Sequence, residues 1–522
     1  MPSMPLPDGD QPWPPKHLAP VYSQIATWAA WYSGDPEALA AIYGGSQGYD
    51  STGFFASERG GWRGAVGRAI ERWFWGTRLS QGEQRTKLHL PAASDIASTS
   101  ADLLFSEAPT LTVEDKATQA RLAELAGDGM QAALLEAAEI AAGLGSVYLR
   151  TVWDTEARPD GPWLTGVHPD AVVPEWSWGE LAAATLWRVL RDDGRTVVRH
   201  LERHNPGRIT HGVYEGTPEK LGRPAPLTEY PETASIDGLS DGNVVETGVP
   251  KLLIEYVPNI KPNRLWRNVP TAAPFGRADI AGTEPLMDAL DEAWTSWMRD
   301  LRLAKARLVV PRAYLQSNGP GRGAGFDVDK ELYEALDMLP GDDTGAQITL
   351  VQFAIRVEEH AKTVEALWSS IVRACGYSVQ TFGELGDAGA GVTATEIRAR
   401  QRRSFMTAGK KVRYWRPRLA SSIETLLMVD AAVFGSRITP VRPQVEFGDS
   451  IAEDPRTTAE TLSLLETARA ISTEMKVRAQ HPDWEGPEVA AEVARIKAEQ
   501  AMSELTDPAT FRGNPPADPA EE

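Results

Sequence analysis

Two helical patterns decide the fold: VEEHAKTVEALWSSIVRAC at residues 357–375 and TATEIRARQRRSFMTAGKKVRYWRPRLASSIETLLMVDAAVF at residues 393–434. In the first pattern, apolar residues recur at steps of three or four, which places them on one face of a helix. These residues are Ala361, Val364, Leu367, Ile371 and Ala374. The segment between the patterns, Gly376 to Gly391, is rich in glycine. Because glycine adopts backbone angles that other residues resist, we expect a hinge there.

The second pattern has an unusual distribution of charge. Between Ile397 and Ile423 there are nine basic residues and no acidic residue. Five of the basic residues are candidates for one basic helix face: Arg398, Arg402, Arg403, Lys410 and Lys411. This face is either solvated beside a buried apolar stripe, or it meets acidic neighbours or a polyanion. Pro417 lies inside the pattern, and an interior proline removes a backbone hydrogen bond at a cost of about 3 kcal/mol, so we expect a kink there.

Composition and charge restrict the class of protein. The chain has 522 residues, of which 42% are hydrophobic and 24% charged, as in a globular protein of several domains. The lone cysteine, Cys375, excludes an intrachain disulfide. The proline-rich start is unlike a signal peptide, and no apolar run of about 18 residues predicts a membrane span. A net charge of −19 argues against a protein that grips DNA tightly, because such affinity comes from basic residues that neutralise phosphates.

Hydrophobic periodicity predicts an α+β fold that is mainly α. In the N-terminal part we expect helices at 17–32, 59–74, 94–105 and 117–142, and a short strand-like piece at 88–91. Period-two alternation then predicts antiparallel strands at 146–153, 172–176, 184–190, 196–202, 208–215 and 252–257, with a loop at 224–248. A helix after Thr283 and the helix at 357–375 flank an insert and would run antiparallel if they pack together. A strand at 444–447 and helices at 455–472 and 487–503 follow.

Several short phrases occur in a fixed order along the chain. They are LHLP at 88–91, DIA at 95–97, ADLLFSE at 101–107, GSVYLR at 145–150, HPD at 168–170, VPEW at 173–176, LERH at 201–204, TFGELGDAGAGVTATEIR at 381–398 and IST at 471–473. Each phrase is weak by itself. In this order and spacing, over nearly the whole chain, they resemble the portal protein, or head-to-tail connector, of a long-tailed double-stranded DNA phage.

The resemblance implies a portal fold with a defined order of parts. These parts are an N-terminal arm (1–20), a wing with helices and antiparallel strands (21–282), a first stem helix (283–307), a clip (308–354), a second stem helix (355–376), a tunnel loop (377–392), a long kinked helix that returns to the wing (393–452), a helical crown (453–506) and a disordered tail (507–522). The resemblance also implies a ring of twelve identical subunits at one vertex of the capsid, assembled in the cytoplasm of the host bacterium. Through this ring the genomic DNA would be packaged and later ejected.

Partners and further site residues follow from the same resemblance. The implied partners are other copies of the chain, the terminase large subunit, the head-tail adaptor, the major capsid and scaffold proteins, and double-stranded DNA in transit without sequence specificity. Candidate tunnel-loop residues are Gly383, Glu384, Gly386, Asp387, Gly389 and Gly391, and candidate clip residues are Arg312, Arg322, Asp327, Asp329, Asp342 and Asp343. Because the loop carries acids and no lysine, its sequence disfavours direct contact with DNA phosphates.

The sequence offers little catalytic chemistry. A G-x-S-x-G pattern at 44–48 is expected to be a simple turn, because helical patterns flank it. The glycines at 319–325 lack the lysine and serine or threonine of a phosphate loop. His200, His204 and His211 could suggest a metal site, but we expect satisfied surface histidines, no metal and no cofactor. The alternatives to a portal are a phage nuclease or hydrolase, which needs a clustered catalytic set, and another head-tail connector or minor capsid component, which is usually far shorter.

Overall fold

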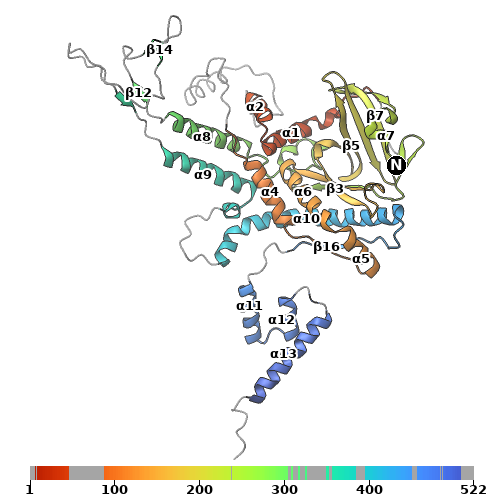
Figure 1. The fold of residues 1–522 in the computed structure, drawn as a ribbon, viewed down its shortest axis with the longest axis vertical. Helices are drawn as coiled ribbons and strands as arrows, with labels where there is room; N and C mark the ends of the chain where they lie inside the picture. Colours follow the sequence, from red (N-terminus) through yellow and green to blue (C-terminus); the bar gives the residue numbers. More distant parts are fainter. Residues whose placement is uncertain are drawn as a thin grey trace, which may run out of the picture. The chain divides into compact units, whose positions relative to one another are not determined.

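The computed structural model divides the chain into two compact units, Met1–Gly448 and Asp449–Glu522. It describes residues 6–7, 9–45, 88–236, 238–303, 307–309, 316–317, 324–325, 349–351, 356–383, 394–448, 455–481, 484 and 486–506. The fold mixes α-helices and β-strands (Figure 1). Within these residues, no helix is both long and apolar enough to cross a membrane.

In the described residues, the N-terminal part of the first unit contains five α-helices. They are α1 (Ala19–Ser33), α2 (Pro36–Gly45), α4 (Ala92–Phe105), α5 (Lys116–Leu125) and α6 (Asp128–Leu144). Helix α4 packs against both α1 and α6. The single helix predicted at 117–142 is wrong, because the chain breaks between α5 and α6 at Gly127. Glycine stabilises a helix interior poorly, which explains a break at this position.

The described strands between residues 146 and 258 form two antiparallel sheets. The larger has the order β4-β5-β6-β7-β10-β9, with β8 paired to β7, and the smaller has the order β11-β2-β3. The strands are β2 (Ser146–Val152), β3 (Trp163–Val167), β4 (Val172–Ser177), β5 (Glu180–Asp192), β6 (Val197–Asn205), β7 (Arg208–Thr217), β8 (Lys220–Ala225), β9 (Leu239–Ser240), β10 (Val244–Glu246) and β11 (Ile254–Pro258). Every strand that we expected from the alternating pattern is present, with ends shifted by a few residues.

Two local predictions in this region are wrong. The loop predicted at 224–248 contains the end of β8, helix α7 (Pro231–Ala234), β9 and β10. Strands β8 and β10 exist because they pair with β7, and pairing of this kind leaves little trace in the local pattern. The strand-like piece predicted at 88–91 is irregular. Its Leu88 and Leu90 backbone N–H groups donate to the Thr295 hydroxyl and the Asp291 carboxylate, both at 2.9 Å, and these two acceptors lie far along the chain on helix α8 (Glu284–Leu303).

The first unit continues into a helical hairpin and a long helix. Helix α8 (Glu284–Leu303) packs against α9 (Val357–Cys375). Two short pairs of strands lie in the described part of the insert between these helices. They are β12 (Arg307–Val309) with β15 (Thr349–Val351), and β13 (Gln316–Ser317) with β14 (Ala324–Gly325). Helix α10 (Ala394–Val433) passes below α4, α6 and β3 in Figure 1. It is followed by β16 (Gln444–Glu446), which pairs with β1 (Thr110–Thr112).

The core of the first unit lies where α10 meets the N-terminal helices. The ring of Trp415 on α10 packs edge-on against that of Phe105 on α4, with centroids 4.9 Å apart, and both residues are fully buried. Aromatic side chains of this size dominate the energy of a core. This packing fixes α10 as a central element to which the rest of the unit is attached.

The second unit is helical in its described part. It contains α11 (Pro455–Thr467), α12 (Thr473–Gln480) and α13 (Gly486–Thr506), and α12 packs against α13. The hydroxyl of Ser472 accepts a hydrogen bond from the Met475 backbone N–H and thus caps α12. Val477 and Val489 are buried within this unit.

Candidate functional site

Helices α8 and α9 run antiparallel. Near the end of α8, the Asp300 carboxylate lies 3.0 Å from Nε2 of His360 in the first turn of α9. At the opposite end of the pair, the Thr283 hydroxyl lies 4.0 Å from the Cys375 thiol. The prediction of an antiparallel pair is therefore confirmed. Both helices extend from a junction with the rest of the unit.

The centre of this junction is Asp279, in the segment that precedes α8. Its Oδ2 atom accepts hydrogen bonds from the Lys411 ammonium at 2.6 Å and from the Tyr377 hydroxyl at 2.7 Å. Its Oδ1 atom accepts one from the Asn259 amide at 2.9 Å. Asp279 is 3% exposed and Lys411 is fully buried, so three separate parts of the chain meet at one buried carboxylate. We call Asp279, Lys411, Tyr377 and Asn259 the junction cluster.

Lys411 links the junction cluster to α4. Its ammonium donates to the Ser100 hydroxyl at 2.5 Å and lies 5.8 Å from the centroid of the Tyr377 ring. Burial lowers the pKa of Lys411, and the neighbouring Asp279 carboxylate opposes this effect. Burial also raises the pKa of Tyr377 well above its usual value, so its hydroxyl stays protonated and donates. The cluster thus connects α10, α4, the segment before α8 and the segment after α9.

A second set of contacts holds the segment after α9 against α10. Helix α9 ends at Gly376, whose φ of 96° lies in the left-handed region that favours glycine. The Thr407 hydroxyl donates to the Gly376 carbonyl at 2.6 Å, and a Cβ on Gly376 would lie only 2.9 Å from that hydroxyl. One turn earlier on α10, the Ser404 hydroxyl accepts from the Ser378 N–H at 2.9 Å. Gly376 therefore serves as a helix cap fixed to α10.

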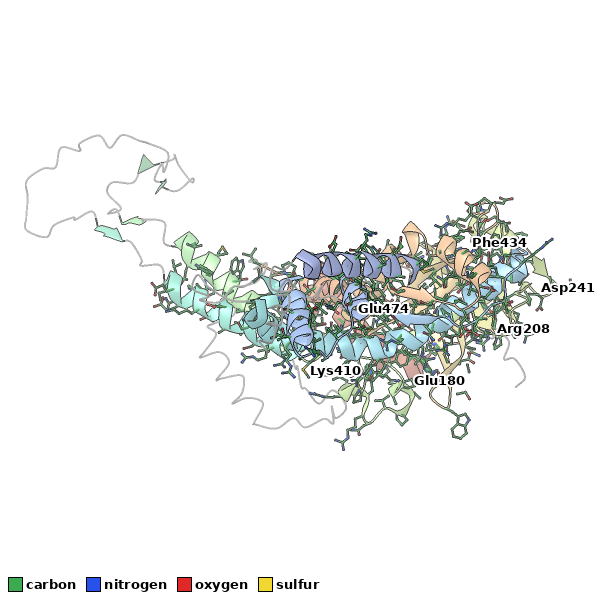
Figure 2. All side chains as sticks on the ribbon, turned by 90° about the horizontal axis from the view of Figure 1, so that it is seen from below. Glu180, Arg208, Asp241, Lys410, Phe434 and Glu474 are labelled. Carbon is green, nitrogen blue, oxygen red and sulfur yellow. The ribbon has the colours of Figure 1, made fainter. Side chains whose placement is uncertain are left out.

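The predicted basic face of α10 needs one correction. Arg402, Arg403 and Lys410 are exposed, but Lys411 is fully buried. Lys411 lies one helical turn before the buried Trp415 and so belongs to the stripe that packs on α4. Figure 2 shows Lys410 at the outer edge of the ribbon. The fifth member of the predicted face, Arg398, lies in the helix, but its side chain is outside the described part of the structure.

Helix α10 continues through Pro417. The Pro417 carbonyl accepts a hydrogen bond from the Arg442 guanidinium at 2.7 Å. The kink that we expect from the missing backbone hydrogen bond stays a prediction.

Near its C-terminal end, α10 is held by another buried ion pair. The Asp430 carboxylate, fully buried, accepts from Nε and Nη2 of Arg121 on α5 at 2.9 and 2.7 Å. This two-pronged geometry is the strongest form of such a pair. Lys251 and Glu424 add a contact of 2.6 Å one and a half turns earlier. Two buried ion pairs, Lys411–Asp279 and Arg121–Asp430, therefore hold α10 in place at two widely separated points.

The remaining predicted site residues lie outside the described residues, with one exception. Gly383 is described and caps a short 3-10 helix, Val379–Phe382, with a φ of 83°. The tunnel-loop and clip residues outside are Glu384, Gly386, Asp387, Gly389, Gly391, Arg312, Arg322, Asp327, Asp329, Asp342 and Asp343. The helix predicted at 59–74 and Ser46 of the G-x-S-x-G pattern are outside as well.

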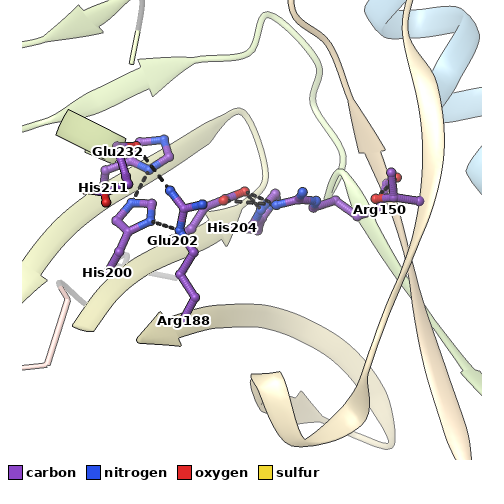
Figure 3. A network of polar contacts seen from close by, with 8 residues as sticks. Arg150, Arg188, His200, Glu202, His204, His211 and Glu232 are labelled. Carbon is purple, nitrogen blue, oxygen red and sulfur yellow. Dashed lines mark hydrogen bonds and ion pairs between the residues drawn. The ribbon is translucent and has the colours of Figure 1, made fainter. Parts of the chain in front are cut away.

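His200, His204 and His211 are buried, so the prediction that they are surface histidines is wrong. His200 on β6 and His211 on β7 stack with ring planes 9° apart, and Nε2 of His200 lies 3.1 Å from Nδ1 of His211 (Figure 3). Nε of Arg188 donates to Nδ1 of His200 at 3.3 Å. Since an arginine can only donate, His200 carries its proton on Nε2 and donates to His211. This order of donors requires that both histidines are neutral.

The same network continues to Glu202 and Arg150 (Figure 3). The Glu202 carboxylate pairs with Nε2 of His204 at 2.7 Å and with Nη1 of Arg150 at 3.1 Å. Burial would raise the pKa of Glu202, but the hydrogen bond from His204 and the nearby positive charges hold it well below its usual value. The network borders a cavity of about 850 Å³. In the part of the chain that the structure describes, no group of three or more His, Cys, Asp or Glu side chains could hold a metal ion.

The sequence patterns missed the acid at the centre of the junction. Asp279 lies between Ala278 and Ile280, which are both buried, and an acid inside a short apolar run was the available signal. The position of Lys411 in the apolar stripe of α10 was a matching signal. Neither signal identifies the partner, because Asp279 and Lys411 are far apart in the sequence and meet only where α10, α4 and the segment before α8 pack together.

The family model described as "Phage portal protein, SPP1 Gp6-like" matches residues 61–504. No curated protein matches the chain significantly. Among solved structures, the chain is similar to a protein in the neck of an empty GTA particle, with a TM-score of 0.41 and 14% identity over 74% of this chain and 88% of that chain. It is also similar to a protein in the neck of a native GTA particle, with a TM-score of 0.39 and 13% identity over 75% of this chain and 88% of that chain. A third similar protein is from the virion of a native gene transfer agent particle, with a TM-score of 0.37 and 13% identity over 79% of this chain and 98% of that chain.

Proposed function

Because the chain belongs to the phage portal proteins of the SPP1 Gp6-like family, we propose that its copies form a ring at one capsid vertex through which DNA enters and leaves the head. The observation that carries this proposal is the family match over most of the chain, residues 61–504. The matched region includes the α8–α9 hairpin, the junction cluster and α10. The role of this family is structural, so the chain acts as a connector between head and tail.

The contacts of the junction suit the mechanical role of a connector. A ring that admits DNA under force needs subunits whose helices keep their relative positions. In this chain, one buried carboxylate joins the start of α8, the segment after α9, and α10. Buried ionic contacts of this kind resist displacement, because separating the partners leaves a charge without compensation. We therefore assign α8 and α9 as the stem and the junction cluster as the joint between stem and wing.

The other parts follow the order that the family resemblance implies. We assign residues 308–354 to the clip, 377–392 to the tunnel loop, 393–452 to the long helix and its return, and 453–506 to the crown. The clip would dock the terminase motor during packaging and later the head-tail adaptor. Scaffold and major capsid proteins would surround the ring at the vertex. The acidic excess of −19 in each copy favours sliding of DNA over binding, because like charges repel along the channel.

The oligomeric mass and symmetry of the purified chain test this proposal. Twelve copies of the 56.9 kDa chain have a mass of about 680 kDa, which light scattering separates clearly from a monomer. We expect negative-stain class averages of a hollow ring. A monomer or dimer that persists after scaffold and capsid proteins are added would contradict the proposal.

A further inference from the structure

A partly apolar groove lies between α4 and the stem hairpin. It has a volume of about 550 Å³ and is lined by Leu90, Leu290, Trp294, Val364 and Trp368, with Asp95 of α4 on its wall. Both tryptophans are half-buried. Large aromatic side chains that stay partly exposed are typical anchors of protein interfaces. This groove could therefore accept a segment of another molecule.

The wall of the groove on α4 is acidic. Asp95 and Asp102 are exposed and seven residues apart, which places them on the same face of the helix about 10 Å from each other. In the described part of the chain, the Asp95 carboxylate has no hydrogen-bond or ion-pair partner. Burial raises its pKa, as expected for an acid that lacks a compensating cation. We call the groove and the Asp95–Asp102 face the acidic groove.

Helix α10 carries a surface of opposite charge. Arg402, Met406, Gly409, Arg413 and Arg416 are all exposed and recur at steps of three or four, so they form one line along the helix. Met406 is 57% exposed, so an apolar side chain lies on this line between the arginines. The line thus combines an apolar centre with basic ends. We call these five residues the basic stripe.

The basic stripe and the acidic groove lie on opposite sides of the α4–α10 pair. The contact between Lys411 and Ser100 marks the side on which the two helices face each other. At 100° per residue, each member of the basic stripe lies within about 40° of the direction opposite to Lys411. Asp95 and Asp102 lie within about 40° of the direction opposite to Ser100. One copy of the chain therefore cannot bring its own stripe to its own groove.

We propose that the basic stripe of one copy docks on the acidic groove of the next copy. This inference rests on the proposed ring and names the surfaces through which its subunits meet. Two different, complementary surfaces on opposite sides make a head-to-tail contact, and a head-to-tail contact closes into a ring when the rotation between copies permits. The tryptophans of the groove would cover Met406, while arginines of the stripe neutralise Asp95 and Asp102.

Gly409 supports a close approach at this surface. A glycine inside a helix destabilises it by about 1 kcal/mol relative to alanine. Within the described chain nothing requires glycine here, because a Cβ at this position would meet no atom within 4 Å. A partner that packs directly on the backbone of α10 explains the residue. We expect Gly409→Leu to weaken assembly about tenfold or more, although it should stabilise the isolated helix.

Charge reversal on each surface tests the proposal. The groove variant is Asp95→Lys/Asp102→Lys, and the stripe variant is Arg402→Glu/Arg413→Glu. All four residues are exposed, so both variants should fold, which circular dichroism and the thermal midpoint would check. We expect each variant alone to stay largely monomeric where the wild type forms rings. A one-to-one mixture should form rings again, since each altered surface then meets its complement in alternating copies.

The outcomes separate this inference from the proposed function. If the wild type forms no ring, the proposed function fails. If the wild type and both variants form equally stable rings, the ring stands and the assignment of its surfaces is wrong. If the stripe variant forms normal rings that package less DNA, the stripe faces DNA and the inference is overturned as well.

A cross-link provides a second readout. Ser98→Cys in the groove and Met406→Cys in the stripe should give a ladder of oxidised oligomers, and Cys375 is buried and should not interfere. Met406→Cys with Asp241→Cys is the matched control pair. A ladder from the control pair, or none from the test pair in rings, would contradict the proposed contact.

Discussion

Lys411 and Asp279 are 132 residues apart in the sequence and 2.6 Å apart in the interior. Their side chains are each 1% exposed, so both charges are buried. A buried pair of this kind contributes little net stability when intact, because the desolvation of both ions offsets their attraction. Its main effect is to make any arrangement that separates α10 from the α8–α9 hairpin unfavourable.

Removal of one partner should therefore be costly. We expect Lys411→Met to lower the free energy of unfolding by about 3–5 kcal/mol, because Asp279 is left as a buried charge without its cation. Lys411→Met with Asp279→Asn should recover part of this loss. Urea unfolding measures the difference, and Lys410→Met is the matched control, since its exposed side chain should matter by less than about 0.5 kcal/mol. Equal effects of the variants at 410 and 411 would contradict the structure.

Gly376 provides a second test of the junction. Gly376→Ala places a side chain at a φ of 96°, which costs about 1–2 kcal/mol, and also drives a Cβ toward the Thr407 hydroxyl. Gly435→Ala is the control, because that glycine has a φ of 68° and open space around it. We expect the Gly376 variant to lose clearly more stability than the control in thermal unfolding. Equal losses would mean that the contact with Thr407 has no energetic importance.

The sequence predicted those parts of the fold that depend on local pattern. The α8–α9 pair and α10 have long periodic patterns, and such patterns depend on one face of a helix being buried. Strands β2, β4, β5, β6, β7 and β11 were predicted from their alternating pattern, whereas β3, which does not alternate clearly, was not. Strands β8 and β10 were missed because their existence depends on pairing with β7, and the sequence around them is low in apolar residues.

The junction cluster could not be derived from local pattern. Asp279, Tyr377 and Lys411 come from separate segments, and their hydrogen bonds form only after α10 has packed on α4. Counting basic residues placed Lys411 on an exposed face, although its helical phase relative to Trp415 already placed it on the buried side. Phase along the helix is thus a better guide to burial than charge in this stretch.

The anchor near the C-terminal end of α10 leads to a prediction about arginine geometry. Arg121→Lys keeps the charge but loses the paired hydrogen bonds to Asp430, so we expect a loss of about 1–2 kcal/mol in the free energy of unfolding. Arg121→Met should cost about 3–5 kcal/mol, because Asp430 is then buried without compensation. Glu124→Gln is the control. Its carboxylate also pairs with Arg121 but is 66% exposed, and such pairs contribute at most about 1 kcal/mol. In urea unfolding, Arg121→Met should lower the stability most, Arg121→Lys less, and Glu124→Gln least.

The stacked histidines of the wing predict a stability that depends on pH. Burial first, and then the charges of His211 and Arg188, lower the pKa of His200 to about 4, from about 6.5 in the unfolded chain. The pKa of His211 is lowered too, chiefly by burial. Because the unfolded chain binds protons more readily, the stability from neutral His200 is complete above pH 6.5 and is lost as the pH falls toward 4. Between pH 7 and 5 the expected loss is roughly 2 kcal/mol.

His200→Gln should remove this loss, and the window from pH 7 to 5 isolates it. The pKa of Glu202 is held low in the fold, so its contribution is present above about pH 4.5 and is lost only at lower pH. Arg150, Arg188 and His204, which also face this network, remain in both proteins, so their contributions to stability cancel in the comparison. We expect the variant to be less stable than the wild type at pH 7. Between pH 7 and 5, however, its free energy of unfolding should fall by about 2 kcal/mol less than that of the wild type. Urea unfolding of both proteins at the same protein concentration measures this difference. His17→Gln, at an exposed position, should leave the pH dependence unchanged. If His200→Gln follows the wild-type pH profile, His200 is not the group that titrates. In that case, the donor order from Arg188 through His200 to His211 is not what stabilises these strands at neutral pH.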